Sequence, residues 1–194
     1  GQRLHREMIQ PCKGYSLAER ELWRHSLAAA IAAGKISSFT RKPIPGSAFT
    51  AALMHDIGKL ILTRYHDPEK ISVINRMVEK GALYIEAERS VLGTDHAVVG
   101  GMMAKRWQFP ESLVHAIEKH HDPDAESSPV LDTVHVANIV AKTLGIGLGS
   151  DQMNLTASTD AAERLGLSSK TLEALCAAVP DELSKTEALF EVRA

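Results

Sequence analysis

The sequence has few aromatic residues, few cysteines and no long apolar run, and each shortage excludes a class of protein. Phe, Trp and Tyr make up 5% of the chain, and strand-like alternation of Val, Ile, Thr and Tyr is hard to find. Cys12 and Cys176, the two cysteines, match no metal or redox spacing, which predicts reduced thiols and an intracellular setting. No run approaches the roughly 20 apolar residues that span a bilayer, and the chain begins without a signal-peptide stretch. We therefore expect a cytoplasmic protein without a membrane partner.

The chain also lacks an excess of charge of either sign. Its net charge is -2 at pH 7, which gives no field that would attract nucleic acid, so a nucleic-acid partner is not expected. The 194 residues are 44% hydrophobic, enough for one domain, or one domain with an appendage, around a substantial core. Nine histidines are the distinctive feature, because histidine binds metals and moves protons near neutral pH.

Ala, Leu, Glu and Lys recur at three- and four-residue intervals and predict an all-α fold. The capping-box pattern at 16–19 predicts a long helix that ends near Ser38. Ser47 is the predicted cap of one continuous, very apolar helix over 48–62, and Thr94 that of a helix over 95–107. Further helices are expected over 68–80, 83–92, 111–121, 130–144, 155–166 and 167–179, the last capped by Ser168 or Ser169, with a short helix after Pro180. The stretch 145–154 is expected to be a linker.

Two groups of polar residues within predicted helices are candidates for metal binding. Glu21 and His25 are four residues apart, so both side chains leave one helix face and could hold one ion; a surface pair is the alternative. His55 and Asp56 lie inside an apolar helix, where they need partners. They form either a satisfied core pair or a metal-binding pair suited to Zn, Fe or Mn. Lys59 would share a face with Asp56 and could neutralise a phosphate oxygen.

Three further histidines occur at helix ends, where side chains converge. His96 begins one predicted helix, and His120 and His121 close another on or beside its apolar stripe. Each alone would be a packing or surface residue, but together with the groups above they are placed where a helical bundle could gather them. The remaining histidines, His5, His66, His115 and His135, have no comparable context and are expected to be surface or packing residues.

The segments LWRHSLA, ALMHDIGKLIL, LGTDHAVVGGMMAKRWQFP, IEKHH and VHVAN together resemble the HDOD family of the HD superfamily. The resemblance covers roughly 22–144 and implies an all-α bundle of bacterial signalling proteins. In related HD-GYP phosphodiesterases and HD phosphohydrolases, the corresponding positions bind two or three metals that cleave phosphoesters. The resemblance carries this ligand role over to Glu21, His25, His55, Asp56, His96, His120 and His121, and the role of assisting the substrate phosphate to Lys59.

The chain departs from that pattern in three places. Asn138 stands where the last ligand is an aspartate, and an amide oxygen binds a metal more weakly; Asp132 could compensate, although a helix-capping role is the stronger expectation. The loop over 122–129 has nothing like the GYP segment, which argues against cyclic di-GMP as a substrate. A further helical stretch usually precedes the WRHS helix in this family and is missing here.

We therefore predict an HDOD-type helical domain over 1–148 with a helical extension over 149–194. Its expected function is bacterial signal transduction with an HD-type site for one or two divalent ions, Fe, Mn or Zn. The alternative is a metal-dependent phosphohydrolase or phosphodiesterase, with Asp56 and Lys59 as catalytic residues and a nucleotide or other phosphoester as substrate. Other signalling proteins or domains are the expected partners, and a homo-oligomer is an open alternative.

Overall fold

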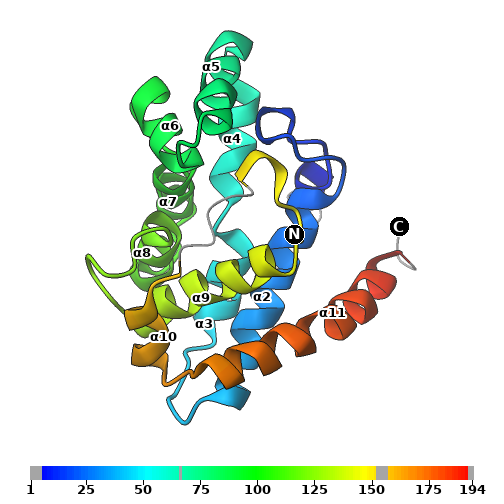
Figure 1. Ribbon diagram of the computed structural model, residues 1–194, viewed down its shortest axis with the longest axis vertical. Coiled ribbons are helices and arrows are strands. Elements are labelled where there is room, and N and C mark those ends of the chain that lie inside the picture. Colours follow the sequence, from blue (N-terminus) through cyan, green and yellow to red (C-terminus); the bar gives the residue numbers. More distant parts are fainter. Residues whose placement is uncertain (1–5, 66, 152–156, 192–194) are drawn as a thin grey trace.

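The computed structural model describes residues 6–65, 67–151 and 157–191, and within these ranges the fold is all-α with no strand (Figure 1). Its elements in chain order are η1 (Lys13–Tyr15), α2 (Glu21–Phe39), α3 (Ser47–Met54), α4 (Ile57–Tyr65), α5 (Pro68–Glu79), α6 (Tyr84–Leu92), α7 (His96–Arg106), α8 (Glu111–Lys119), α9 (Pro129–Thr143), η2 (Gly149–Asp151), α10 (Thr159–Leu165) and α11 (Ser169–Glu191). The predicted all-α class is confirmed. None of the described helices is long and apolar enough to cross a membrane.

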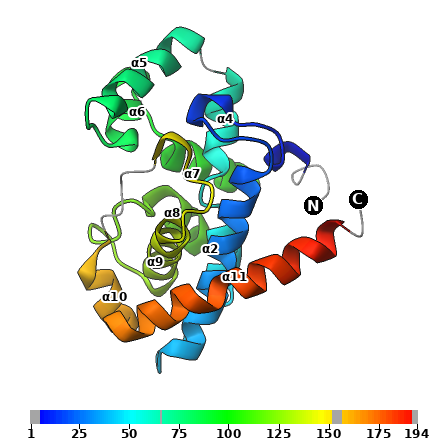
Figure 2. The same cartoon turned by 45° about the vertical axis from the view of Figure 1, so that its right-hand side comes forward.

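The helix α2 is the centre of the bundle. It packs against α3, α9 and α11, while α7 packs against α4 and α8 (Figures 1 and 2). The alanines at 28, 29, 30, 32 and 33 are fully or almost fully buried, and such small side chains let neighbouring helices approach α2 closely. A second, smaller core that includes Tyr15, Leu17 and Tyr84 joins the N-terminal turn to α4, α5 and α6.

The predicted capping box at 16–19 is wrong. Ser16 has a left-handed backbone conformation (φ 53°), and Tyr15 and Leu17 on either side of it are buried in the smaller core. The chain turns back there, since Leu17 N–H donates to Cys12 O and Cys12 N–H donates to Leu17 O. The helix α2 therefore begins at Glu21, whose own carboxylate accepts the Ala18 N–H at 2.7 Å. Its end at Phe39 agrees with the prediction.

The predicted continuous helix over 48–62 is broken at His55 and Asp56. Successive residues of an α-helix point about 100° apart, so an unbroken helix cannot turn both side chains to one place. In the structure α3 ends at Met54 and α4 begins at Ile57. The break is stabilised by a contact of 2.7 Å between His55 Nδ1 and Ala52 O and by the Lys59 N–H, which donates to Asp56 O.

Two further boundaries differ from the predictions. Asp95, one residue after Thr94, caps α7 by accepting the Val98 N–H at 2.9 Å. The helix α11 continues through Pro180, and no separate short helix follows it within the described residues. Leu175, Val179 and Leu183 are buried at four-residue intervals, so packing on one face offsets the hydrogen bond that proline removes. The predicted cap at Ser168 is confirmed, because its Oγ accepts the Thr171 N–H.

Candidate metal centre

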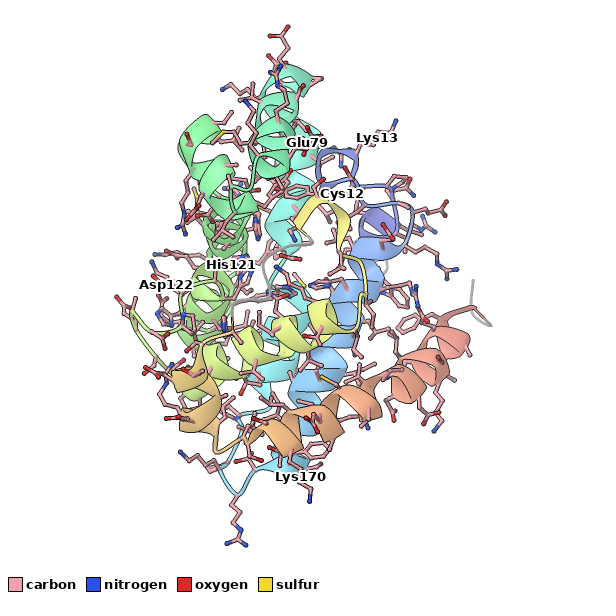
Figure 3. The ribbon with its side chains drawn as sticks, in the orientation of Figure 1. Cys12, Lys13, Glu79, His121, Asp122 and Lys170 are labelled. Carbon is pink, nitrogen blue, oxygen red and sulfur yellow. The ribbon has the colours of Figure 1, made fainter. Side chains whose placement is uncertain are left out.

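Five helices or helix ends bring the predicted ligand residues to the middle of the bundle. His25 lies in α2, His55 and Asp56 at the break between α3 and α4, and His96 at the start of α7. His120 and His121 directly follow the end of α8, and Figure 3 labels His121 there. Asn138 lies in α9 and is buried.

The ligand atoms form two groups of three. His25, His55 and Asp56 make up one group, and His96, His120 and His121 make up the other; within each group the nitrogen and oxygen atoms lie within 4.8 Å of one another. Two ligands of one ion are about 3 Å apart at ordinary bond lengths, so each group is looser than a metal-bound set and its members would draw together around an ion. The sequence prediction that these residues converge therefore holds for six of them.

Asp56 joins the two groups, because its two oxygens face different ones. Oδ2 lies 3.5 Å from His55 Nε2 and 3.7 Å from His25 Nε2. Oδ1 lies 3.4 Å from His96 Nε2 and 3.9 Å from His120 Nε2. A carboxylate in this position can bind two ions at once, one through each oxygen.

Backbone carbonyls fix the orientation of three of the rings. Nδ1 of His25, His55 and His120 lies 2.7–2.8 Å from the carbonyl oxygens of Ile146, Ala52 and Ile117, respectively. A carbonyl oxygen only accepts hydrogen bonds, so Nδ1 carries the proton in each ring and the Nε2 lone pair faces the centre. This is how metal-binding histidines are usually held.

The loop after α9 closes over one side of the centre. Ile146 O holds His25, and at Gly147 (φ +57°) an added Cβ would lie 2.4 Å from Glu21 O and 2.8 Å from His25 Cβ. Only glycine, which has no Cβ, fits where the loop comes this close to α2. Ile146 and Gly147 of the predicted linker therefore contact the site, whereas residues 152–154 of that stretch lie outside the described ranges.

Glu88 and Tyr15 were not among the predicted site residues, yet they hold His96. Glu88 Oε2 lies 2.6 Å from His96 Nδ1 and also accepts the His96 backbone N–H at 3.1 Å. Its other oxygen accepts a hydrogen bond from Tyr15 O–H. All three residues are buried. The signal available in the sequence was a glutamate, Glu88, on the apolar stripe of an amphipathic helix, three or four residues from Ile85 and Leu92 and eight before a candidate ligand.

Three buried atoms in the centre have no hydrogen-bond partner: His55 Nε2, Asp56 Oδ1 and His120 Nε2. All three are lone-pair donors, and a buried polar atom without a partner is costly. Divalent cations would satisfy them, His55 Nε2 in one ligand group and Asp56 Oδ1 with His120 Nε2 in the other, and imidazole nitrogens with a carboxylate oxygen suit Zn, Fe or Mn. The residues present therefore fit a metal ion.

The protonation states of His55, His120 and Asp56 also suit a metal site. Burial lowers the pKa of His55 to about 4, and burial likewise lowers the pKa of His120 well below its usual value, so both rings are neutral near pH 7. Burial acts to raise the pKa of Asp56, but His55 and Lys59 outweigh it and hold that pKa well below its usual range. Burial also opposes protonation of His96, yet the Glu88 carboxylate raises its pKa overall.

Lys59 donates to Asp56 Oδ2 at 2.7 Å and is itself buried. It lies on the same helix turn as Asp56, as the sequence predicted, but its ammonium group already neutralises the carboxylate. Asn138 Oδ1 lies 3.0 Å from His25 Nε2, and with the His25 proton on Nδ1 both atoms offer lone pairs, so the amide oxygen stands beside the ring nitrogen at the centre.

Several predicted residues lie elsewhere. Glu21 is not in either ligand group, because its carboxylate caps the start of α2. Asp132 neither compensates for Asn138 nor caps α9: Ser128 is the cap, and Asp132 accepts two hydrogen bonds from Arg164 in α10. His115 is a half-buried partner of Glu126 at 3.0 Å. His135 is buried, and His5 and His66 lie outside the described residues.

The amino-acid sequence matches one known domain family and one curated protein. The sequence profile of the HDOD domain matches residues 4–123. A protein of Treponema pallidum (strain Nichols) without a functional name is 23% identical over 129 residues, which cover 64% of this chain and 25% of that protein.

Solved structures share the fold. A candidate signal-transduction protein of Marinobacter aquaeolei VT8 matches 86% of this chain with a TM-score of 0.70 at 19% identity. A candidate phosphohydrolase of Shewanella amazonensis SB2B matches 84% with a TM-score of 0.62 at 24% identity. The MmoQ response regulator of Methylococcus capsulatus matches 80% with a TM-score of 0.54 at 26% identity. The chain spans 38%, 58% and 59% of these three proteins, respectively.

Proposed function

The chain belongs to the HDOD domain family, and from this premise we propose that it is a bacterial signal-transduction domain that holds one or two divalent metal ions at its centre. His25, His55, Asp56, His96, His120 and His121 would be the ligands, with the Asn138 amide beside His25. The observation that supports this most strongly is the set of three buried, unpartnered lone pairs on His55, Asp56 and His120. The division of the chain at residue 148 into a domain and an extension stays a prediction.

Burial of the site favours a regulatory role over a catalytic one. His55, Asp56, His96 and His120 are at most 2% exposed, so a phosphoester has little access to them. The lysine that would meet a substrate phosphate is bonded to Asp56 instead. The names of two structural relatives, a candidate signal-transduction protein and a response regulator, agree with this assignment. Partners would then be other signalling proteins or domains.

A metal-dependent phosphohydrolase is the second candidate, and the position of Asp56 favours it. A carboxylate that faces two ligand groups is a feature of two-metal sites, where the ions act as Lewis acids on phosphoester oxygens. In that case His121, the half-buried member of the ligand set, would mark the side on which a substrate approaches. Lys59 would leave Asp56 and bind a phosphoryl oxygen.

Elemental analysis of the purified protein tests the metal site. We expect at least about one Fe, Mn or Zn ion per chain in the wild type, in line with one complete ligand group. His55→Ala removes one proposed ligand from the group of His25, His55 and Asp56 and should reduce the metal content per chain to near zero. His115→Ala, a histidine outside the site, should keep the wild-type content. A wild-type protein that binds none of these metals in the folded state contradicts the proposal.

Hydrolysis of bis-p-nitrophenyl phosphate with added Mn²⁺ or Fe²⁺ separates the two functions. A metal-loaded protein without turnover supports the regulatory role. Turnover that Asp56→Ala abolishes, while His115→Ala retains it, would instead establish the phosphohydrolase.

A further inference from the structure

His135 connects the metal centre to the C-terminal helices. It lies in α9 and is buried, and its two ring nitrogens bond to segments far apart in the chain. Nδ1 lies 2.8 Å from the backbone oxygen of His120, and Nε2 lies 2.9 Å from the backbone nitrogen of Ser158. The imidazole of His135 thus links the turn that carries His120 and His121 to Ser158, the N-cap residue of α10.

The chemistry of the two neighbours fixes the role of each nitrogen. A carbonyl oxygen only accepts, so Nδ1–H donates to His120 O; an amide N–H only donates, so Nε2 accepts from Ser158. A neutral ring with the proton on Nδ1 satisfies both bonds at once. No other side chain of similar size offers a rigid donor and acceptor at this separation.

The far end of the bridge is firmly held. Ser158 Oγ caps α10 by accepting the Ala161 N–H and donates to Asp124 Oδ1, both at 2.9 Å. Arg164, one turn into α10, bonds to Asp124 at 2.9 Å and to Asp132 at 2.7 Å. The loop that follows His121 is therefore attached to α10 at one end and to the metal centre at the other.

We propose that His135 is a positioning residue for the His120–His121 turn and that it makes the metal affinity of the centre depend on the docking of α10. The inference rests on the proposed metal site. Ordering of α10 would hold the His120 backbone, and with it the ring that offers Nε2 to the ion. By linkage, metal binding would strengthen the docking of α10 by the same factor.

A pair of substitutions at Ser158 isolates the bridging bond. Ser158 has φ -68°, which proline adopts without strain, so Ser158→Pro deletes the N–H that His135 accepts. Ser158→Ala keeps this N–H and removes only the hydroxyl, so it is the matched control. The apparent Kd for Mn²⁺ is measured for the wild type, H135A, S158P and S158A, with circular dichroism of the metal-free proteins to establish that each is folded.

We expect H135A and S158P to raise the Kd for Mn²⁺ about tenfold, at the lower end of the effects of residues that support ligands. S158A loses the hydroxyl bonds to Ala161 and Asp124 but keeps the bridging N–H, so it should raise the Kd less than S158P does. Wild-type affinity in folded H135A and S158P would overturn the inference, as would equal losses in S158P and S158A. If H135A does not fold, the Ser158 pair decides. A wild type that binds none of Mn²⁺, Fe²⁺ and Zn²⁺ would refute the proposed metal site itself, an outcome distinct from wild-type affinity in the two variants.

Discussion

At the residue scale, the histidines proposed as ligands differ in what holds the second ring nitrogen. Three of them use backbone carbonyls, whereas His96 uses the buried carboxylate of Glu88. A carboxylate partner makes the imidazole a stronger electron donor and adds a negative charge next to the site. That charge stands close to a ligand set in which Asn138, a neutral amide, replaces the expected aspartate. Glu88 therefore restores part of the charge that Asn138 removes.

Glu88→Gln should weaken metal binding by about 10- to 100-fold, because the amide leaves His96 without an anionic partner. The measurement is the Kd for Mn²⁺ by competition with a chelating dye. Glu86→Gln, an exposed glutamate on the same helix, is the control and should bind as the wild type does. Equal affinities for Glu88→Gln and the wild type would show that the carboxylate has no part in the site.

Individual site residues were predictable where a polar group stands in an apolar helix. His55 and Asp56 satisfy that condition, and the structure brings them together with the histidines from α2, α7 and α8. Glu88 and His135 were missed because their partners, Tyr15 and Ser158, are distant in the chain and meet them only after folding. Glu21 was assigned by its spacing to His25, yet a local backbone N–H satisfies its carboxylate.

The crossing of α4 and α7 determines, at the element scale, how close Asp56 comes to His96. At Gly58 an added Cβ would lie 1.9 Å from His96 O and 2.8 Å from Gly100 N, so the two helices touch backbone to backbone. The glycine therefore brings the first turn of α7 next to the break that carries Asp56. A larger residue would separate the two ligand groups.

Gly58→Ala should destabilise the protein by about 3 kcal/mol or more, because neither backbone can move away without disturbing the core. Urea unfolding measures the change. Gly46→Ala is the control, since nothing lies within 4 Å of a Cβ at that position, and it should unfold within about 0.5 kcal/mol of the wild type. A Gly58→Ala protein of wild-type stability would contradict the close crossing.

Most elements follow from local sequence, and the exceptions have tertiary causes. Proline and glycine signals predicted α5, α8 and α9 nearly at their observed bounds. The break at His55 was missed because the sequence there is apolar and helical, and only convergence on the site requires two side chains to face one point. The uninterrupted α11 was missed because burial of Val179 beside Pro180 outweighs the local preference of proline.

The buried histidines act together at the scale of the whole molecule. Burial lowers the pKa of His25, His55, His120 and His121 in the folded, metal-free protein. As the pH falls below about 6.5, the unfolded chain binds protons at these residues while the folded chain does not. The unfolded state is therefore favoured increasingly in acid. His96 acts in the opposite direction, because its raised pKa means that the folded state binds this proton first as the pH falls, which offsets part of the loss.

The metal-free protein should lose stability as the pH falls from about 6.5 to the pKa of His55, about 4, by about 1.4 kcal/mol per pH unit from His55 alone, and the other histidines of lowered pKa add to this loss. Urea unfolding in EDTA at pH 7 and pH 5 provides the test. His115→Ala, outside the cluster, should show the same dependence as the wild type. A stability that is unchanged between these pH values would mean that the cluster is not neutral in the folded state.

The loop at Gly145–Gly147 bears on the rate at which a bound ion would leave the proposed centre. Because Ile146 holds His25 and Gly147 lies against α2, we expect an ion held in the proposed centre to leave when this loop lifts. Its residence time is then the lifetime of the closed loop. A chelator added in excess would strip the protein at one fixed rate, and doubling its concentration would not hasten the loss.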